Sequence, residues 1–248
     1  YDYQEVKGPM MMDRVLWEKS GHWEKFGDEL FHVKGKYENL VLKPMNCPHT
    51  HMIYNARKRS YRELPMRLAE YGQVYRFERS GTMHGLMRVR GFCQNDAHIY
   101  VSKDQLKAEF LKVLQLFKQA YEVFGIDDYW FRLSLPNFEK DKYEGDQELW
   151  RESGDIIRSA MQEFGADFVE AEGEAAFYGP KIDIQTRNVT GKEDTIATSQ
   201  SDVLVPGRMG LKYVDRDNQE CRPLIIHRAI LGSLERFMGF YIEKTAGW

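Results

Sequence analysis

Residues 71–100 read YGQVYRFERSGTMHGLMRVRGFCQNDAHIY, and this stretch decides the fold. Successive side chains of a strand point to opposite faces of its sheet, so the residues of a strand divide into two sets. The odd-numbered residues between 87 and 99 are small or apolar apart from Asn95. From position 88 the even-numbered set is polar or aromatic: Arg88, Arg90, Phe92, Gln94, Asp96 and His98. In the preceding strand Val74, Arg76 and Glu78 share a face. The pattern predicts two strands, joined by a loop at 80–86, that line one specialised face of a sheet.

That face carries arginines where a solvated face usually carries lysine, glutamate or threonine. Arg76, Arg88 and Arg90 lie on it, without a lysine. The planar guanidinium fork suits phosphate or carboxylate, and a neighbouring aromatic ring can stack on a base. The residues therefore favour a nucleotide-binding face, although a face that is only solvated remains the alternative.

Patterns elsewhere predict an α+β domain. We expect helices at 10–19 (with Pro9 at the first position and an end near Gly21), from the capping box 102–105 to 124, at 146–164 and at about 228–244. Expected strands are 29–33, 39–43, 72–79, 87–99, 129–135, 167–171, 181–188, 195–205, 211–215 and 222–226, with hairpin turns at 188–192 and 215–218. Strands that follow one another in hairpins indicate a mainly antiparallel sheet with helices packed on it, rather than a Rossmann-type sheet.

Composition excludes several classes of protein. The 248 residues allow one large or two small domains. The chain lacks a run of roughly 18 apolar residues and a signal peptide, so we expect a cytoplasmic protein without a membrane span. Three separated cysteines (Cys47, Cys93 and Cys221) do not make a disulfide framework, and a net charge of −3 gives no basic field. The chain starts with Tyr1 instead of methionine, as a piece of a longer protein would.

Two common catalytic signatures are missing from the sequence, namely the P-loop and the G-x-S-x-G elbow. Cys47, His98 and His227 are too far apart in the chain for their spacing to predict a metal site.

Motifs spread over the whole chain resemble the catalytic domain of the threonyl-tRNA synthetases, a family of class II aminoacyl-tRNA synthetases. They are YQEV at 3–6 through LWEKSGHW at 16–23 (motif 1 and its sequel), KPMNCP at 43–48, YRFE at 75–78 to RVRGF at 88–92 (motif 2), NDAHI at 95–99, AFYGPKID at 176–183 and HRAILGSLERF at 227–237 (motif 3). Motif 2 alone indicates class II only. The NCP, NDAHI and IHRAILGS segments together point to the threonine enzymes.

The resemblance implies a six- or seven-stranded, mainly antiparallel sheet flanked by helices. It implies that residues 1–248 form a single class II catalytic domain, with the editing and anticodon-binding domains absent from this chain. The implied reaction has two steps: L-threonine and ATP give threonyl-adenylate, and the threonyl group then moves to the 3′ end of tRNA(Thr). Relatives dimerise through motif 1, so we expect a homodimer formed around Pro9.

The resemblance also assigns an ATP site. Arg76 would hold the α-phosphate and the threonine carboxylate, Glu78 the adenine amino group, and Arg88 the γ-phosphate. Phe92 and Arg236 would sandwich the adenine. Gln200 and Ser233 are the remaining residues implied to bind ATP. Mg²⁺ would bridge phosphate oxygens, with Asp183 as a candidate neighbour.

In this family one cysteine and two histidines hold Zn²⁺, and those positions match Cys47, His98 and His227. The zinc would bind the amino and hydroxyl groups of threonine, which separates threonine from valine better than an apolar pocket can. Lys181 would approach the threonine carbonyl and His22 would assist proton movement in the transfer step. The implied threonine contacts are Met45, Gln94, Asp96 and Tyr178.

The chain departs from the family pattern at two places. His49, Thr50 and His51 follow the NCP segment, where many relatives have Gly-His. Thr195 and Ala197 stand where relatives often have glutamine and glycine, which puts the affinity for ATP in question. We expect His49, His51 and His84 not to be metal ligands. Two alternatives stay open: an inactive paralogue that only binds nucleotide or zinc, and another class II synthetase such as the prolyl or seryl enzyme.

Overall fold

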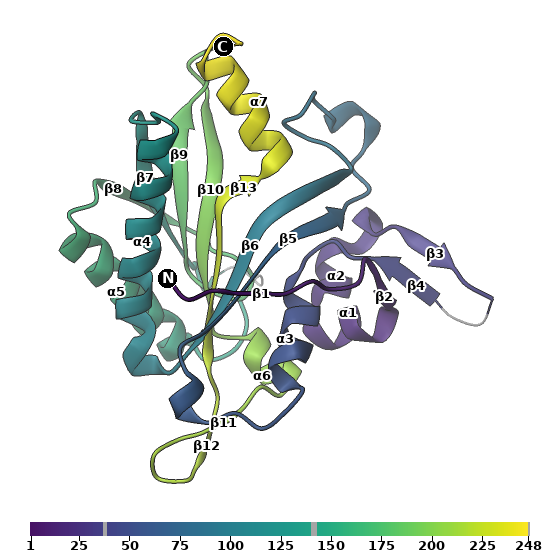
Figure 1. Cartoon of the computed structure of the whole chain (residues 1–248), viewed down its shortest axis with the longest axis vertical. Coiled ribbons are helices and arrows are strands. Elements are labelled where there is room, and N and C mark those ends of the chain that lie inside the picture. Colours follow the sequence, from purple (N-terminus) through teal and green to yellow (C-terminus); the bar gives the residue numbers. More distant parts are fainter. Residues whose placement is uncertain (37–38, 140–142, 248) are drawn as a thin grey trace.

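The computed structural model describes residues 1–36, 39–139 and 143–247. In this part of the chain the main sheet has eight strands in the order β1-β5-β6-β13-β10-β9-β7-β8 (Figure 1). The five central pairings are antiparallel, whereas the two edge pairings are parallel. The strands are β1 (Gln4–Glu5), β5 (Met66–Tyr75), β6 (Gly91–Val101), β7 (Tyr129–Leu135), β8 (Phe168–Glu172), β9 (Lys181–Arg187), β10 (Glu193–Asp202) and β13 (Leu224–Ser233).

The mainly antiparallel α+β architecture expected from the sequence is confirmed. The described sheet exceeds the expected six or seven strands because short edge strands join it on each side: β1, of two residues, pairs with β5, and β8 pairs with β7. Around the sheet lie α1 (Arg14–Ser20), α2 (His22–Phe26), α3 (Cys47–Asn55), α4 (Leu106–Val123), α5 (Gln147–Phe164), α6 (Val205–Met209) and α7 (Leu234–Lys244). Smaller sheets are formed by β2 (Met11–Asp13), β4 (Asn39–Leu42) and β3 (His32–Lys34), and by β11 (Tyr213–Val214) and β12 (Glu220–Cys221).

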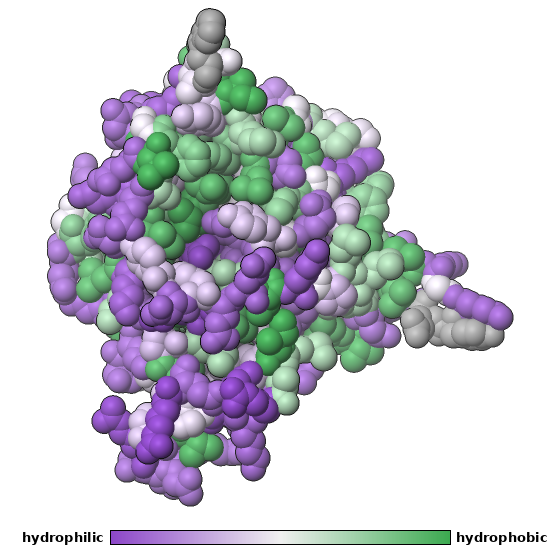
Figure 2. All heavy atoms as spheres, viewed as in Figure 1, coloured by the Kyte–Doolittle hydropathy of each residue, from purple (hydrophilic) through white to green (hydrophobic). Residues whose placement is uncertain are grey.

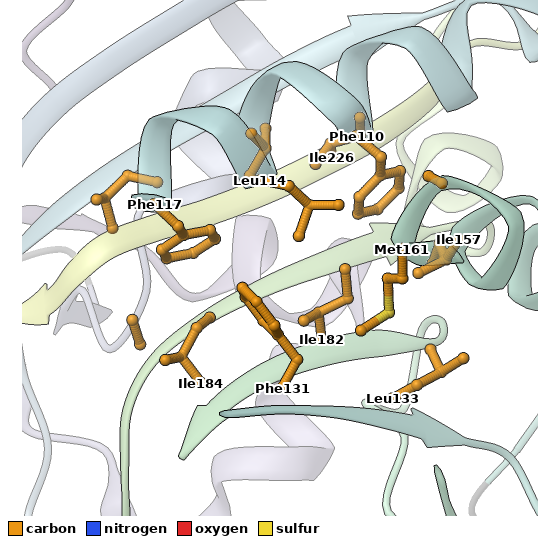
Figure 3. Packing of buried hydrophobic residues seen from close by; sticks show 14 of the residues in the cluster. Phe110, Leu114, Phe117, Phe131, Leu133, Ile157, Met161, Ile182, Ile184 and Ile226 are labelled. Atoms are coloured by element: carbon orange, nitrogen blue, oxygen red, sulfur yellow. The ribbon is translucent and has the colours of Figure 1, made fainter. Parts of the chain in front are cut away.

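The main core lies between one face of the sheet and helices α4 and α5. Phe110, Leu114 and Phe117 of α4 point at strand residues such as Phe131 and Ile182 (Figure 3). Each of these side chains is at least 96% buried, and burial of one such side chain contributes about 1.5–3 kcal/mol. Because this face is filled with apolar side chains, the opposite face of the same strands is the one left for chemistry.

Two expected helices begin later than the sequence predicts. Residues 11–13 form strand β2 and pair with β4, so the first helix begins at Arg14. Its N-cap is Asp13, whose side chain accepts a hydrogen bond from the Val15 amide, and Pro9 is not its first residue. The last helix begins at Leu234, because 224–233 form β13 in the centre of the sheet. Tertiary pairing overrides the local helical pattern in both cases.

Other expectations agree with the structure more closely. The capping box at Ser102, helix α5 with Gly165 behind it, and strand β7 are confirmed. Strand β5 covers 66–75 instead of 72–79, and β6 starts at Gly91, so Arg88 and Arg90 precede the strand. The helix α3, which contains Cys47, is not predicted by the sequence patterns.

The two expected hairpin turns are present. The Asn188 amide donates to the Lys192 carbonyl, and the Asp215 amide donates to the Gln219 carbonyl. The second turn joins β11 and β12 at an end of the molecule that is mainly hydrophilic (Figure 2). Among the described residues, none of the helices combines the length and the apolar character that crossing a membrane requires.

Gly232 lets β13 turn into α7 beside the sheet. Its φ is +61°, and a Cβ at this position would lie 2.5 Å from the Ile196 carbonyl oxygen. We expect Gly232→Ala to destabilise the fold by about 1–3 kcal/mol more than Gly210→Ala. Gly210 is the matched control, because its φ is +68° but open space surrounds it. Urea denaturation of both variants measures the difference, and an equal loss of stability would show that the close approach is unimportant.

Candidate functional site

A cavity opens on the sheet face opposite α4 and α5. It is lined by the segment that follows β5, by residues 86–89, by β6, by β10, and by β13 and its junction with α7. Lining residues with expected roles are Arg76, Glu78, Arg88, Phe92, Gln94, Ser233 and Arg236. The structure therefore brings together most of the ATP-site residues that the sequence singled out.

Glu78 organises the two arginines that precede β6. Arg88 donates through Nε to Glu78 Oε2 at 2.8 Å, and Arg90 donates through Nε to the Glu78 carbonyl at 3.0 Å. These bonds fix both arginines outside the regular strand in which we expected them, and of the two Arg88 lines the cavity. The five N–H donors of Arg88 exceed what one carboxylate can accept, so donors remain for a ligand.

Arg76 is held by neutral partners. Its Nε donates to the Pro44 carbonyl at 3.2 Å, and its guanidinium lies 5.2 Å from the ring centres of Phe26 and Phe92. Among the described residues no carboxylate lies within 4.0 Å of this side chain, and burial lowers its pKa. A largely desolvated cation without an anionic partner attracts phosphate or carboxylate.

Arg236 approaches the cavity from the first turn of α7. Its Nε donates to the Met87 carbonyl at 3.1 Å, and its amide donates to the N-cap hydroxyl of Ser233, also at 3.1 Å. Strand β6 supplies Phe92 and Gln94, and Gln94 is the Cα partner of Ser233 on β13. A planar group can therefore enter between elements that are far apart in sequence.

Farther along the same face of β6 lies a cluster of one cysteine and two histidines. Cys47 starts α3, and His98 and His227 are directly opposite each other on β6 and β13. Ligand atoms of Cys47, His98 and His227 all lie within 4.8 Å of one another, and the three residues are buried. Within the described chain His98 Nε2 lacks a hydrogen-bond partner. A thiol with two imidazoles is a donor set that suits Zn²⁺, and three protein ligands leave a fourth position open.

Burial disfavours charge on two members of the cluster, His98 and Cys47. It lowers the pKa of His98 well below its usual value, with His227 as the next cause, and it raises the pKa of the Cys47 thiol, as do Asp96 and Asp202. Binding of a cation would reverse this preference for the thiol, because a coordinating cysteine gives up its proton.

A second group overlaps the first. His51, Asp202 and His227 also have ligand atoms within 4.8 Å of one another. His51 Nδ1 lies 2.9 Å from the Tyr100 hydroxyl, and His227 Nε2 lies 3.0 Å from Asp202 Oδ2. We did not expect His51 to be a ligand, and sequence reasoning missed Asp202 as a contact of His227. The sequence signal that could have revealed this contact is that Gln200 and Asp202, two residues apart in an expected strand, share one face of it.

The expected threonine contacts surround the cluster. Asp96 accepts from Asn46 Nδ2 at 3.0 Å, and burial raises its pKa. Tyr178 donates to Gln200 Oε1, and its ring centre is 5.1 Å from that of His227. Met45 lies beside this group, at 3.2 Å from a guanidinium nitrogen of Arg76. Gln200, expected in the ATP site, therefore contacts one of the expected threonine-binding residues and is not among the residues that line the cavity.

Lys181 is fixed by a buried polar network. Its Nζ donates to Asp183 Oδ2 at 2.7 Å. Asp183 also accepts from Arg132, Ser134 and Thr198, so both carboxylate oxygens are occupied. Asp183 is only 1% exposed and holds Lys181 in place, and its role as a neighbour of Mg²⁺ stays a prediction.

His22 is fully buried among aromatic rings. Its Nδ1 lies 2.8 Å from the Ser20 hydroxyl, and its ring packs edge-on against Phe177 at 5.7 Å. Burial lowers the pKa of His22 to about 3, so its imidazole is neutral at pH 7. It can exchange a proton through hydrogen bonds but does not supply a positive charge.

The departure at His49 is accommodated by a contact with a buried carboxylate. His49 Nε2 lies 2.5 Å from Glu70 Oε1, and Lys43 Nζ lies 3.4 Å from the other oxygen. Gly8 leaves room for the His49 ring, because a Cβ there would lie 2.2 Å from it. His49 and Lys43 flank the segment that carries Met45 and Cys47, so Glu70 ties this segment to β5.

The departures at Thr195 and Ala197 lie in the cavity wall. A register irregularity separates the two residues in β10. Thr195 accepts from Gln185 Nε2 at 2.7 Å, and Ala197 is 3% exposed. Both residues line the cavity and lie outside the cysteine–histidine cluster, so they affect the shape of the cavity.

Comparison with known proteins identifies the family to which this chain is similar. Residues 31–245 match the family of the tRNA synthetase class II core domain (G, H, P, S and T). The chain is 47% identical over 247 residues to a threonine–tRNA ligase of Bacillus velezensis, a match that covers 99% of this chain and 38% of that protein. Threonine–tRNA ligase 1 of Bacillus subtilis matches with the same identity and coverage. The chain thus spans about two fifths of the length of these relatives.

Solved structures show the same similarity. A structure described as the RNA binding domain of a Cryptosporidium parvum threonyl-tRNA synthetase has a TM-score of 0.91 at 36% identity, covering 99% of this chain and 61% of that one. A putative threonyl-tRNA synthetase of Aeropyrum pernix has a TM-score of 0.88 at 34% identity, covering 99% and 57%. A Giardia lamblia prolyl-tRNA synthetase, at 15% identity and a TM-score of 0.72 over 98% and 42%, shares the fold alone.

Proposed function

Because the chain belongs to the family of class II tRNA synthetase core domains, we propose that it activates L-threonine with ATP and transfers the threonyl group to tRNA(Thr). The 47% identity to threonine–tRNA ligases favours threonine over the other amino acids of the class. The observation that carries the proposal is that one sheet face holds both an arginine-lined cavity and the Cys47–His98–His227 cluster.

In the first step a carboxylate oxygen of threonine would attack the α-phosphorus, and the bond to the leaving pyrophosphate would break. Arg76, which has no anionic partner among the described residues, would bind the α-phosphate and the attacking carboxylate. Arg88 would hold the γ-phosphate, and Glu78 would accept from the adenine amino group between Phe92 and Arg236. Mg²⁺ would accompany the phosphates. Catalysis then consists of positioning and charge stabilisation, without a covalent enzyme intermediate.

In the second step a ribose hydroxyl at the 3′ end of tRNA(Thr) would attack the threonyl carbonyl, and AMP would leave. Lys181, oriented by Asp183, would donate toward the carbonyl oxygen. His22 is neutral at pH 7 and has an unpartnered Nε2 within the described chain, which suits a role in moving the hydroxyl proton.

The cysteine–histidine cluster would select the amino acid. Zn²⁺ held by Cys47, His98 and His227 would serve as a Lewis acid that ligates the amino and hydroxyl groups of threonine. Valine carries a methyl group in place of the hydroxyl, and an apolar pocket separates such a pair only about 10²-fold. Met45, Gln94, Asp96 and Tyr178 would orient the bound threonine. Serine keeps the hydroxyl, so it should pass this filter and would need correction in a separate editing domain.

We also propose a homodimer through the motif 1 region. A depression lined by residues 7–19 and by α3 contains Met12, Leu16 and Ile53. Beside it Val15 and Met52 are 65% and 56% exposed, which is unusual for apolar side chains on one patch. A second copy of the chain would cover this surface.

ATP–pyrophosphate exchange tests the activity. We expect exchange with threonine and with serine, but not with valine or proline. Arg76→Ala should lower threonine-dependent exchange by about 10²–10³-fold, whereas the exposed Arg62→Ala should not. Exchange with proline but not threonine would indicate another class II synthetase, and the absence of exchange with every amino acid would favour an inactive paralogue.

Metal analysis tests the cluster. We expect about one zinc per chain, which Cys47→Ala removes because the thiolate is lost. Cys93→Ala is the matched control, since this half-buried cysteine lies outside the cluster and should keep the metal. A wild-type protein purified without zinc, and unable to take it up, would contradict the assignment.

Light scattering tests the dimer. The wild-type chain should have twice the monomer mass, and Val15→Asp should dissociate it because a charge would be buried in the interface. Val123→Asp places the same charge on α4, where the valine is 82% exposed, and should leave the dimer intact. A monomeric wild-type chain would refute the proposal.

A further inference from the structure

Asp202 connects helix α6 to one of the clustered histidines. Its side chain is fully buried at the end of β10. Oδ1 accepts from the backbone amides of Leu204 at 3.0 Å and Val205 at 2.8 Å, and Oδ2 lies 3.0 Å from His227 Nε2. The carboxylate is thus held on one side by the start of α6 and presents its other oxygen to the imidazole.

We propose that Asp202 is a positioning residue for metal binding, one that sets the tautomer of His227; the inference rests on the zinc site of the proposed function. A neutral imidazole carries one proton, and the hydrogen bond at one nitrogen decides which nitrogen is left unprotonated. An ionised carboxylate can only accept. Asp202 therefore places the proton on Nε2 and leaves the lone pair of Nδ1 for the metal. Such carboxylate–histidine pairs orient metal ligands in many sites.

Sheet register makes this contact possible. Gln200 is the Cα partner of His227 across β10 and β13, and Asp202 is two residues farther along the same face. Diagonal neighbours of this kind lie within reach of longer side chains. The contact is therefore built into the centre of the sheet and not into a loop.

The overlapping group His51–Asp202–His227 offers a competing arrangement, in which Asp202 itself would be a ligand. Two observations oppose it. Asp202 Oδ1 already accepts from the amides of Leu204 and Val205, and this group lacks a thiol, which the other group has in Cys47. The Nε2 atoms of His51 and His98 both lack a hydrogen-bond partner among the described residues, so the imidazoles do not distinguish the two groups. Zinc prefers the set that contains sulfur and nitrogen.

The variant Asp202→Asn tests the proposal in the full chain. Its amide keeps the size of the side chain and can still accept at α6, but its NH₂ group would donate to Nε2 and shift the His227 proton to Nδ1. We expect zinc affinity, measured by competition with a chelator, to fall about 10–100-fold, with one zinc per chain retained at saturation. Glu109→Gln is the control: this buried carboxylate of α4 pairs with Arg67 of β5, and its loss should leave zinc affinity unchanged.

Cobalt substitution separates the two groups. The charge-transfer absorption of a thiolate–Co²⁺ bond should be present in the wild type, persist in Asp202→Asn and vanish in Cys47→Ser. If the wild-type cobalt protein lacks this band and His51→Gln abolishes binding, Asp202 is a ligand and the proposal is overturned. Wild-type affinity in Asp202→Asn would overturn it as well.

A measurement on the wild type keeps the proposal testable if Asp202→Asn does not fold. ¹⁵N NMR of the metal-free protein should show His227 protonated at Nε2, and protonation at Nδ1 would refute the role of Asp202. A wild-type chain that binds no zinc would instead refute the zinc site on which the proposal rests. Loss of amino acid activation alone would refute neither.

Discussion

The register between β6 and β13 is the constraint on which the site depends. It places His98 directly opposite His227 in the centre of the sheet, with their ring centres 4.7 Å apart. A slip of one residue would turn every side chain of one strand to the other face. His98 would then point into the apolar core, and Ile99 would take its place at the cluster. The hydrophobic packing of α4 and α5 against the other face therefore also fixes the chemistry, because it allows only one register.

Desolvation determines how the polar face behaves. Burial drives His98, His51 and His22 toward their neutral forms and keeps the Cys47 thiol protonated, since each pKa moves in the direction that removes charge. The buried Lys43 forms an ion pair with Glu70, and His49 contacts the same carboxylate. Arg76 has no ion-pair partner within 4.0 Å among the described residues, because its neighbours are a carbonyl, a thioether and two rings. Such a site favours binding of a cation at the cysteine–histidine cluster and of an anion at Arg76.

The period-two pattern of residues 71–100 was enough to predict a specialised sheet face. It succeeded from Phe92 to His98, where the strand is regular, and failed in detail at Arg88 and Arg90, which precede the strand and donate to Glu78. Of these two arginines, Arg88 lines the cavity. The resemblance to threonyl-tRNA synthetases, carried by motifs along the whole chain, is confirmed by the family match and by relatives at 47% identity. Local patterns misplaced the starts of the first and last helices. Local patterns contain no information that β4 pairs with residues 11–13 or that β6 and β10 pair with residues 224–233.

The sequence by itself determined the α+β class, most of the strands and the residue types of the polar sheet face, because these follow from local periodicity and side-chain chemistry. Only the tertiary structure decided that Cys47, His98 and His227, separated by 51 and 129 positions, share one buried cluster. It also decided that Asp202 contacts His227, that Asp183 is fully occupied by Lys181 and its neighbours, and that His49 pairs with Glu70. Such contacts join residues remote in the chain, and their geometry is set by strand register and helix packing, which single-sequence patterns do not encode.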